Sequence, residues 1–530
     1  MKKIILLTIL FTASLLFSQN RINLQILNSN NIHLALQNIG KLGAIPVAFG
    51  GGVWKILSFD STIVYDHGPW IIGKIDNKVH LSISQWGTNY SPGPIINNKA
   101  AMQYKPEDSL KYRIYKISKG DNTTNKDYAE WPFEFGAPKT KDGKPKLYQD
   151  QSLWCTYNAM FPSVKKQIPS FTDSLPIMPL EIHQLVYAKK GNSKDEVDLF
   201  SNTVFFEWTI INKGTLPIDS AYFSFWTDID FDMATANFPA VDTTNNLGYM
   251  WSNKTKPQPA IGYTLLFGPA VPAYKKKAVF KGQLRNDFAN LNVTSFQAIY
   301  DDYPYLAGVD RPSFSRTEAW NIVRGFYPSG KAKVDSSNNS VTKFSYSGDP
   351  VTNSGWLWGY GNSGGGAGFN LSSGPFNLAP NDTQWVMMAL VPALGKDYKE
   401  SITIMRNKVK LLKTLPYDSL AFGRKAVMVG VEKGKIIPTE ISLEQNYPNP
   451  FNPETVISYS IPKSEHVTLM VYNLLGKEVA TLVDEFKQAG NYKVRFNVET
   501  LHAASLSSGI YFYRLTTPTT IVAKKMMLVK

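Results

Sequence analysis

Three aspartates spaced two residues apart in "TDIDFD" form the segment of this 530-residue chain best suited to binding a metal ion. Alternate residues of a strand face the same side, so a strand here would place Asp228, Asp230 and Asp232 on one face. Carboxylates gathered on one face repel one another unless water or a hard cation separates them, and Ca²⁺ prefers oxygen ligands of this kind. We therefore expect either a solvated acidic loop or a Ca²⁺ site, with Asp242 of "AVDTTNN" as a further ligand.

The acidic segment does not follow the EF-hand pattern. An EF-hand loop needs glycine at its sixth position and a bidentate glutamate at its twelfth, and Met233 and Pro239 occupy those places here. We assign no catalytic role to these carboxylates or to any other residue of the chain.

Two motifs that could support hydrolysis lack the context they need. "GNSGGG" (361–366) matches G-x-S-x-G, but a nucleophilic serine requires a strand–turn–helix around it. The flanking sequence has no helical period, so we expect a flexible glycine loop. The six histidines show neither an H-E-x-x-H motif nor an i, i+4 pair, which disfavours a zinc hydrolase. They are His33, His67, His80, His183, His466 and His502.

Aromatic residues in "GWLWGY" could bind sugars. Trp356, Trp358 and Tyr360 would share one face of a strand and form a stacking platform, although packing in the core is the alternative. Paired carboxylates for glycoside hydrolysis are defined by their separation in space, which a sequence does not give. We therefore expect a non-catalytic ectodomain (structural, adhesive or binding), with a secreted hydrolase acting on polysaccharide or protein as the alternative.

The composition predicts a mainly β, multi-domain protein. Hydrophobic residues make up 43% of the chain and charged residues 18%, and 27 Tyr, 29 Phe and 12 Trp favour strands. We expect one or more β-sandwiches followed by a small Ig-like β-sandwich at the C-terminus. The only cysteine, Cys155, has no partner for an internal disulfide and is expected to be a buried apolar residue.

The N-terminus has the features of a secretory signal peptide. Lys2 and Lys3 precede an apolar run from Ile4 to Phe17, and polar residues follow from Ser18. No later stretch reaches the roughly 18 apolar residues that a membrane-spanning helix requires. We expect an exported protein without a transmembrane segment.

Local patterns predict several elements of the ectodomain. Residues 68–87 indicate paired strands that turn at Asp76-Asn77, and residues 204–232 indicate a hairpin around Asn212-Lys213-Gly214. Residues 372–394 predict two more strands. One helix is expected at 396–414, where apolar residues recur at helical spacing. These residues are Ile402, Met405, Val409 and Leu412.

The net charge of +14 is spread along the chain, with its densest patches in "PKTKDGKPK" (138–146) and "YKKKAVFKG" (274–282). Loop clusters of this size indicate either solubility or attraction to acidic glycans and the cell surface. No arginine-rich helix or nucleic-acid motif accompanies them, so nucleic acid is not expected as a partner.

The last part of the chain alternates polar and apolar residues in short strands separated by turns. "NYPNPFNPETVISYSIP" (446–462) opens it with prolines that fix φ and remove N–H donors, and "NLLGK" places Gly476 where a positive φ is needed. Short strands with turn signals at this spacing indicate a small β-sandwich over residues 441–530.

This tail resembles the C-terminal sorting domain (type A) of the type IX secretion system. The resemblance is carried by "NYPNPFNPETVISYSIP", "VTLMVYNLLGKEVATLV", "AGNYKVRFNV", "LSSGIYFYRL" and "KKMMLVK". It implies that the type IX machinery takes the folded protein from the periplasm across the outer membrane, and that the protein is then released or attached to surface lipopolysaccharide. The residues that carry the motif are Asn446, Tyr447, Pro448, Asn449, Pro450, Phe451, Asn452, Pro453, Gly476, Gly490, Gly509, Tyr511, Lys524 and Lys525.

Blocks within residues 50–410, such as "GPWIIGKIDN" and "SGPFNLAPNDTQWVMMALV", resemble an uncharacterised ectodomain type often found before this tail. This second resemblance brings no known activity. The expected organisation is a signal peptide (1–18), an N-terminal β-rich region (19–180), a β-sandwich ectodomain with the helix (181–430), a linker (431–440) and the sorting domain (441–530).

Overall fold

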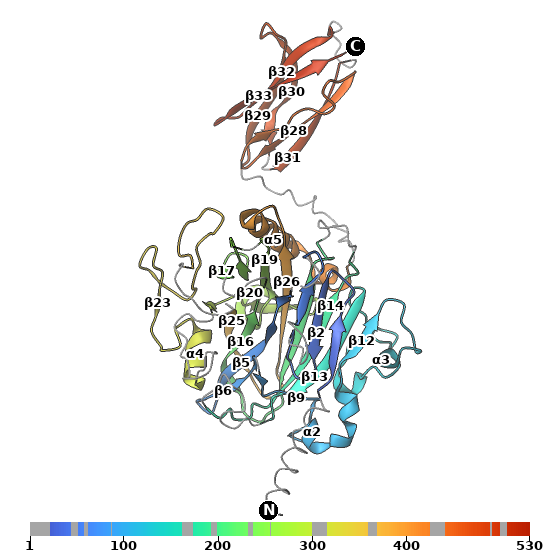
Figure 1. Cartoon of the computed structure of the whole chain (residues 1–530), viewed down its shortest axis with the longest axis vertical. Helices are drawn as coiled ribbons and strands as arrows, with labels where there is room; N and C mark the ends of the chain where they lie inside the picture. The colour runs from blue at the N-terminus through green and yellow to red at the C-terminus, as the bar shows by residue number, and fades with distance from the viewer. Residues whose placement is uncertain are drawn as a thin grey trace, which may run out of the picture. The chain divides into compact units, whose positions relative to one another are not determined.

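The protein divides into two compact units, Met1–Ala426 and Val427–Lys530, which are described separately. The computed structural model describes residues 22–43, 51–57, 62–85, 87–161, 173–191, 199–229, 231, 237–254, 256–298, 315–358, 368–423, 440–487, 490–498 and 506–529. The expected signal peptide lies outside these residues, as does the expected linker except for Glu440. The fold is mainly β, as the composition predicts (Figure 1).

Two antiparallel sheets form the centre of the first unit. The smaller sheet contains, in order, β22 (Ser295–Ala298), β25 (Phe369–Leu378), β16 (Ile218–Asp228), β5 (Asp66–Ile75) and β6 (Lys78–Ser82). The larger sheet contains β12 (Tyr115–Ser118), β13 (Gln151–Asn158), β14 (Leu180–Ala188), β15 (Val204–Asn212), β26 (Thr383–Ala393), β19 (Ala260–Phe267), β18 (Leu247–Trp251) and β17 (Phe238–Asp242), with β9 (Ser91–Pro92) beside β13.

Smaller elements complete the first unit. A four-stranded sheet contains β1 (Leu24–Leu27), β2 (Ile32–Gln37), β3 (Gly52–Trp54) and β4 (Thr62–Val64). Strand pairs are β7 (Ser84–Gln85) with β8 (Gly87–Thr88), β10 (Ile95–Ile96) with β11 (Lys99–Ala100), β20 (Ala270–Phe280) with β21 (Gln283–Asn290), and β23 (Lys333–Val334) with β24 (Val341–Thr342). The helices are α2 (Ala101–Tyr104), α3 (Lys126–Ala129), α4 (Arg316–Arg324), α5 (Tyr398–Thr414) and α6 (Tyr417–Phe422), with 3₁₀ turns η1 (Pro106–Tyr112) and η2 (Phe133–Phe135).

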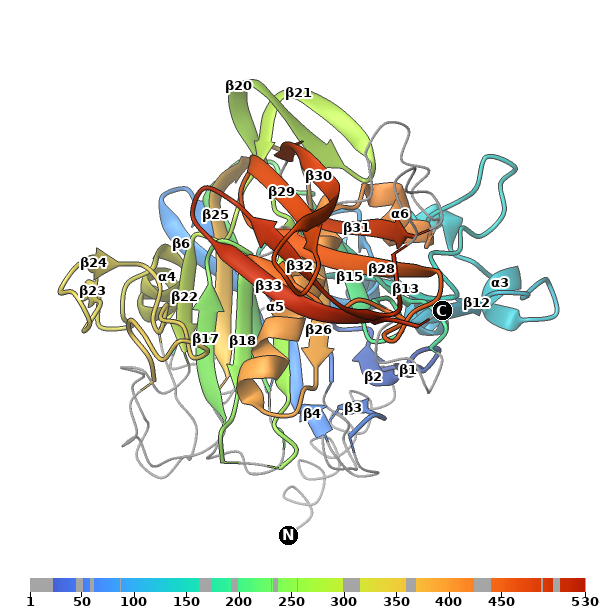
Figure 2. The same ribbon diagram turned by 90° about the horizontal axis from the view of Figure 1, so that it is seen from above.

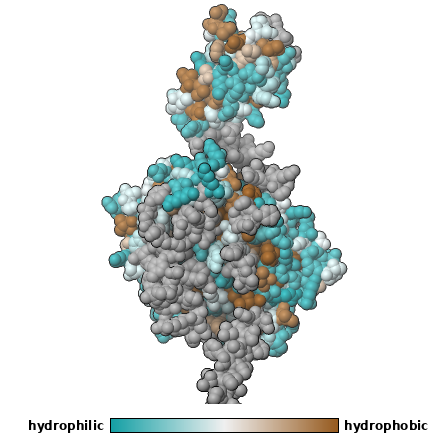
Figure 3. All heavy atoms as spheres, viewed as in Figure 1, coloured by the Kyte–Doolittle hydropathy of each residue, from teal (hydrophilic) through white to brown (hydrophobic). Residues whose placement is uncertain are grey.

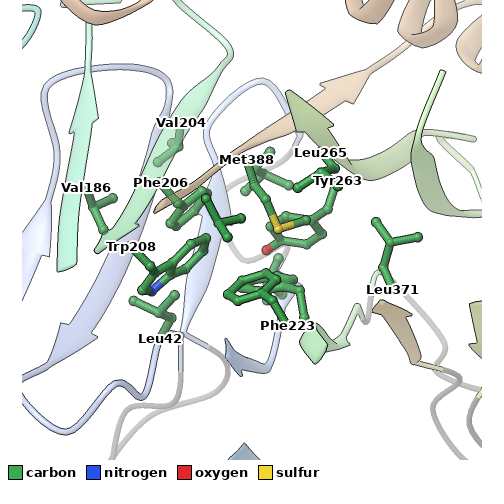
Figure 4. Close-up of a cluster of buried hydrophobic side chains, with 14 of the residues drawn as sticks. Leu42, Val186, Val204, Phe206, Trp208, Phe223, Tyr263, Leu265, Leu371 and Met388 are labelled. Carbon is green, nitrogen blue, oxygen red and sulfur yellow. The ribbon is translucent and has the colours of Figure 1, made fainter. Parts of the chain in front are cut away.

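Aromatic and aliphatic residues fill the space between the two main sheets (Figure 4). The rings of Trp208 on β15 and Phe223 on β16 lie 5.3 Å apart across the interface, and Tyr263 on β19 lies 4.8 Å from Phe225. These side chains are almost completely buried. Burying an aromatic or large aliphatic side chain stabilises a fold by about 1.5–3 kcal/mol, so this layer is a main source of stability.

Helices cover the outer face of each main sheet. On the smaller sheet, Trp320 and Val323 of α4 pack against Trp70 and Trp226. On the larger sheet, α5 buries Ile402, Met405, Val409 and Leu412, and α6 packs beside it. The predicted helix is therefore confirmed together with its buried face. The layers are helix, small sheet, large sheet and helix.

The predicted strand pair at residues 68–87 is confirmed, because β5 and β6 pair around Asp76 and Asn77, both with positive φ. The predicted hairpin at 204–232 is wrong. β15 lies between β14 and β26 in the large sheet, whereas β16 lies between β25 and β5 in the small sheet. The turn residues at 212–214 therefore begin a crossover between the sheets.

Asn212 joins this crossover to a second one between β25 and β26. Its backbone N–H donates to the Asp382 carbonyl at 3.1 Å, and its carbonyl accepts from the Asn381 N–H at 2.7 Å. Its side-chain amide donates to the carbonyls of Leu378 and Leu216. One buried asparagine thus satisfies the backbone of two loops that would otherwise leave polar groups unpaired.

Strands on both sides of the boundary expected at residue 180 share one sheet. β13 and β14 pair over their full length, from Gln151↔Ala188 to Asn158↔Glu181. β14 then pairs with β15 on its other edge.

The second unit is a sandwich of two sheets. One has the order β27 (Ser442–Leu443), β28 (Glu454–Ile461) and β31 (Gly490–Asn497), and the other has β30 (Glu478–Lys487), β29 (Glu465–Tyr472), β32 (Gly509–Thr516) and β33 (Ile521–Leu528). Gly476 has φ +75°, as its turn predicts. Several apolar side chains of this unit remain exposed, among them Leu475, Phe486 and Ile521 (Figure 3).

A buried histidine predicts how the stability of the first unit depends on pH. The Tyr263 hydroxyl and His67 Nδ1 share a 2.6 Å hydrogen bond in the core, and burial lowers the pKa of His67 to about 3. The folded state keeps this imidazole neutral, whereas the unfolded chain protonates it below pH 6.5. Its contribution is thus present above pH 6.5 and is lost as the pH falls towards 3. Between pH 7.5 and 4.5 we expect this residue to remove roughly 2–3 kcal/mol of unfolding free energy.

Urea unfolding of the full chain at these two pH values, followed by tryptophan fluorescence, measures the loss. His67→Gln should lower stability at pH 7.5 but show a difference between the two pH values smaller by about that amount. An equal pH dependence in the variant and the parent protein would contradict this assignment.

Candidate functional site

The proline-rich start of the sorting motif is held in place by a buried asparagine. Asn446 donates from its side-chain amide to the Pro448 carbonyl at 3.1 Å and to the Thr455 hydroxyl at 3.0 Å. Its backbone N–H donates to the hydroxyl of Tyr513, which in turn donates to the Glu444 carbonyl. Tyr447 is 82% exposed next to it. Asn446 therefore fixes the backbone while its neighbour faces solvent.

The two ends of the sorting motif meet in space. The Phe451 N–H donates to the Met527 carbonyl at 2.9 Å, and the Val529 N–H donates to the Phe451 carbonyl at 3.0 Å. The Asn449 side chain accepts from the Met527 N–H. The segment at 446–453 thus runs along the last strand, β33, which carries Lys524 and Lys525.

Other motif residues have structural roles in the same unit. Tyr511 faces the core, and its hydroxyl donates to the Ser507 carbonyl at 2.9 Å. Gly490 and Gly509 begin β31 and β32. The remaining residues, Pro450, Asn452 and Pro453, complete the segment before β28.

Asp228 ends β16 and lies opposite Asp66 of β5 in the strand register. Both residues are buried, and Asp66 Oδ2 lies 3.4 Å from Lys41 Nζ. Asp230 and Asp232 lie outside the described residues. Two acidic residues therefore lie opposite each other at this strand end, and the charge of Lys41 partly compensates their negative charge.

Asp242 lies in the other main sheet, at the end of β17. Its carboxylate is 3.3 Å from Arg406 Nε of α5 and accepts hydrogen bonds from the backbone and side chain of Asn245. Arg406 also binds Asp349 at 2.8 Å and the Tyr249 hydroxyl at 3.1 Å. Asp242 therefore already has a cationic partner. Across the described part of the chain, no group of three or more His, Cys, Asp or Glu is arranged to hold a metal ion.

Among the described candidates, Trp356 and Cys155 are buried and Trp358 is partly buried. Trp356 and Trp358 pack on Tyr346, with ring centroids 5.1 and 4.8 Å apart, and Trp356 is 8% exposed. Tyr360 and the "GNSGGG" segment lie outside the described residues. Burial raises the pKa of the Cys155 thiol, so this cysteine remains a thiol at neutral pH and serves as an apolar core residue.

The two basic segments of the sequence converge at α6. Lys281 and Gly282 form the turn between β20 and β21, and Gly282 lies against the Tyr417 ring of α6, where a Cβ would come within 2.8 Å of Cδ1. On the same helix, Lys146 Nζ lies 4.7 Å from the centre of the Phe422 ring. Burial lowers the pKa of Lys281, and the charge of Lys146 lowers it further against the opposing effect of Glu207. The two lysines are therefore electrostatic neighbours.

The rest of this surface lies on the β20–β21 hairpin, which extends beyond the main sheets (Figure 2). Tyr274 is 80% exposed and Leu284 62% exposed, and Arg285 lies 4.3 Å over the Phe288 ring. Lysines 275–277 are exposed beside Tyr274. We call this surface the basic face; its residues are Lys146, Lys275, Lys276, Lys277, Lys281 and Arg285.

A buried carboxylate binds α6, the helix at which the two basic segments meet. Glu207 of β15 accepts hydrogen bonds from the Tyr187 hydroxyl at 2.9 Å, the Tyr417 hydroxyl at 3.1 Å and Trp385 Nε1 at 3.0 Å. Burial raises its pKa in spite of these donors and the charge of Lys281. The sequence analysis missed Glu207, whose only local signal is a single acidic residue inside the apolar run "VFFEWTII". It joins α6 to the large sheet.

Residues 445–530 match the family described as the secretion system C-terminal sorting domain. No curated protein matches the chain. Among solved structures, a polysaccharide lyase is 8% identical with a TM-score of 0.20, and the match covers 87% of this chain and 47% of the lyase. Latent PorU from Porphyromonas gingivalis is 8% identical with a TM-score of 0.15, covering 96% of this chain and 33% of PorU. TM-scores this low support no argument about fold or function.

The tail is thus a type IX secretion sorting domain, as the sequence motif predicts. It directs the protein to the cell surface or the extracellular space and implies an interaction with the type IX secretion machinery. No helix in the described ranges is long and apolar enough to span a membrane.

Replacing Asn446 should loosen the sorting domain. Asn446→Ala removes three side-chain hydrogen bonds in a buried site, those with Gln445, Pro448 and Thr455, which costs about 1–3 kcal/mol. Hydrogen exchange of the full chain should show faster exchange in β28 and β33 and a smaller secreted fraction. The matched control is Lys493→Ala, because Lys493 is exposed on β31, outside the proline-rich segment. Equal exchange and secretion for both variants would contradict the anchoring role of Asn446.

Proposed function

We propose that the protein is a secreted or surface-attached binding protein whose first unit attaches to acidic glycans, including those of surface lipopolysaccharide, through the basic face. Its export by the type IX route places it where such polymers are abundant. One observation carries the proposal: the two lysine-rich segments, at 138–146 and 274–282, meet on one surface around α6.

The cations of the basic face are only partly balanced by acidic groups, since the charge of Glu207 acts on Lys281. In the part of the chain that the structure describes, no ion pair involves Lys275, Lys276, Lys277, Lys281 or Arg285. Cations held within about 8–10 Å of one another at physiological salt repel, so an anionic polymer that bridges them gains electrostatic energy.

The shape of the hairpin supports binding to an extended polymer. Exposed Tyr274 lies next to three consecutive lysines, and the Arg285 guanidinium lies over Phe288. Aromatic rings stack on sugar faces while cations bind carboxylate, phosphate or sulfate groups. A long two-stranded hairpin presents these groups in a row, as a linear glycan requires.

Salt-dependent binding to polygalacturonate and heparin tests the proposal. Replacing Lys275, Lys276 and Lys277 together with glutamine should weaken binding about tenfold or more at low salt, because each exposed ionic contact contributes about 0.5–1 kcal/mol. The affinity of the parent protein should fall steeply between 0.05 and 0.5 M NaCl.

The control replaces Lys78, Lys331 and Lys343, three exposed lysines that lie elsewhere on the first unit. It carries the same change in net charge and should bind like the parent protein. Equal losses in both triple variants would show a nonspecific charge effect and would overturn the proposal. Release of new reducing ends from either polymer would favour the alternative of a secreted hydrolase.

We also propose that Ca²⁺ binds at Asp228, Asp230 and Asp232, with Asp242 engaged by Arg406 instead of the ion. The proposal is supported by the buried pair Asp66 and Asp228 at the strand end, where a cation would relieve repulsion between carboxylates.

Excess Ca²⁺ should raise the melting temperature of the parent protein above its value in chelator, because an ion that binds only the folded state stabilises it. Asp230→Ala should abolish the difference, whereas Asp219→Ala, at the exposed start of β16, should retain it. An unchanged melting temperature would remove the Ca²⁺ site.

A further inference from the structure

A cleft of about 390 Å³ opens on the outer face of the large sheet, separate from the basic face. Charged side chains, one aromatic ring and several apolar residues surround it. Its lining consists of Pro94, Ile95, Ile96, Glu134, Phe135, Gly136, Glu181, His183, Ile211 and Lys213. Nothing in the sequence patterns brings these segments together.

Glu181 and His183 lie two residues apart on β14 and therefore face the same side. His183 Nε2 lies 2.9 Å from Glu181 Oε1, and the Ile95 N–H donates to Glu181 Oε2 at 2.8 Å. Lys213 Nζ is 4.0 Å from the same carboxylate. Burial opposes ionisation of Glu181, but the His183 hydrogen bond, the Ile95 N–H and Lys213 together lower its pKa. The carboxylate is therefore charged and already has partners.

This arrangement fixes the orientation of His183. An ionised carboxylate only accepts, so Nε2 carries the proton and Nδ1 keeps a lone pair when the imidazole is neutral. The Trp154 ring packs against the imidazole in an edge-to-face arrangement, with ring centroids 5.7 Å apart. No residue in the described ranges donates a hydrogen bond to Nδ1.

Gly136 lies directly against the imidazole of His183. It ends η2 with φ +87°, and a Cβ at this position would lie 2.4 Å from His183 Cε1 and 2.9 Å from Nδ1. The absence of a side chain therefore allows the Gly136 backbone to pack against the edge of the ring that carries Nδ1. Phe135 and exposed Glu134 precede this glycine and reach the same cleft.

The groups around the cleft match a neutral sugar. His183 Nδ1 and the Glu134 carboxylate accept hydrogen bonds from hydroxyl groups, Lys213 donates to an oxygen, and Phe135 offers a ring face for stacking. Glu134 and Glu181 outnumber Lys213, which disfavours an anionic group here. We propose that this cleft binds an uncharged pyranose unit of a glycan, with His183 and Glu134 as the acceptors that select its hydroxyl pattern.

The cleft and the basic face lie along one strand. Tyr148 stacks on Tyr187 at 5.3 Å near α6, while Gly136 contacts His183 four residues earlier on β14, a separation of about 13 Å. The loop that joins Gly136 to Lys146 therefore runs from one site to the other. The inference deepens the proposed glycan binding, on which it rests, because one polymer with neutral and acidic units could occupy both sites.

Calorimetric titration of the full chain with neutral pentasaccharides of glucose, mannose, xylose and galactose tests the cleft separately from the basic face. At least one should bind with an affinity that stays within about twofold between 0.05 and 0.5 M NaCl, because the ligand is uncharged. Glu134→Gln and His183→Gln should each weaken this binding about tenfold, since the first replaces a charged acceptor oxygen by an amide donor and the second removes the Nδ1 lone pair. Glu134 is exposed, so its variant keeps the fold.

The control Glu107→Gln makes the same charge change on exposed η1, and it should bind neutral sugars like the parent protein. The variant in which Lys275, Lys276 and Lys277 are replaced with glutamine should also bind them like the parent protein. Retention of neutral-sugar binding when that variant loses polygalacturonate would separate the two sites. Binding of none of the pentasaccharides, or equal affinity in the Glu134 and Glu107 variants, would overturn the assignment. Loss of polyanion binding alone leaves the cleft intact and counts only against the basic face.

Discussion

The central strands of the first unit are apolar on both faces, and this constraint decides what surrounds them. Every residue of β13 is buried, and neighbouring residues such as Phe205 and Phe206 on β15 point into different cores. An antiparallel sheet can leave one face in water only when that face is polar. Each main sheet therefore needs two covers, its partner sheet on one side and a layer of helices and loops on the other.

The polar groups on these covered faces organise the outer layer. Glu207 and Glu181 lie on the outer face of the large sheet, where an unpaired carboxylate would be costly. Tyr417 of α6 satisfies the first, and the Ile95 N–H with His183 satisfies the second. The two basic segments meet at α6, and Ile95 lines the cleft. The donors that pair with these two buried carboxylates therefore lie beside both proposed binding surfaces.

Local patterns in the sequence predicted single elements well and their partners poorly. The helix at 398–414 and the turn at Asp76-Asn77 follow from spacing and from residues that tolerate positive φ. The pairing of β15 with β26 joins residues far apart in the chain, and no short window contains it. For the same reason the sequence showed two basic segments but not their meeting at α6, and it gave no signal for Glu181 with His183. The sorting tail was predictable because each block of its motif is a local pattern in the sequence.

The sorting domain shows why distant blocks can belong to one motif. Phe451 exchanges backbone hydrogen bonds with Met527 and Val529, so the proline-rich segment occupies the position that a further strand would take beside β33. Because proline lacks an N–H donor, Pro450 and Pro453 limit this pairing to the residues between them. The first and last parts of the tail therefore depend on one another for their hydrogen bonds. A chain that lacked Met527 and Val529 would therefore leave the proline-rich segment without its hydrogen-bond partners.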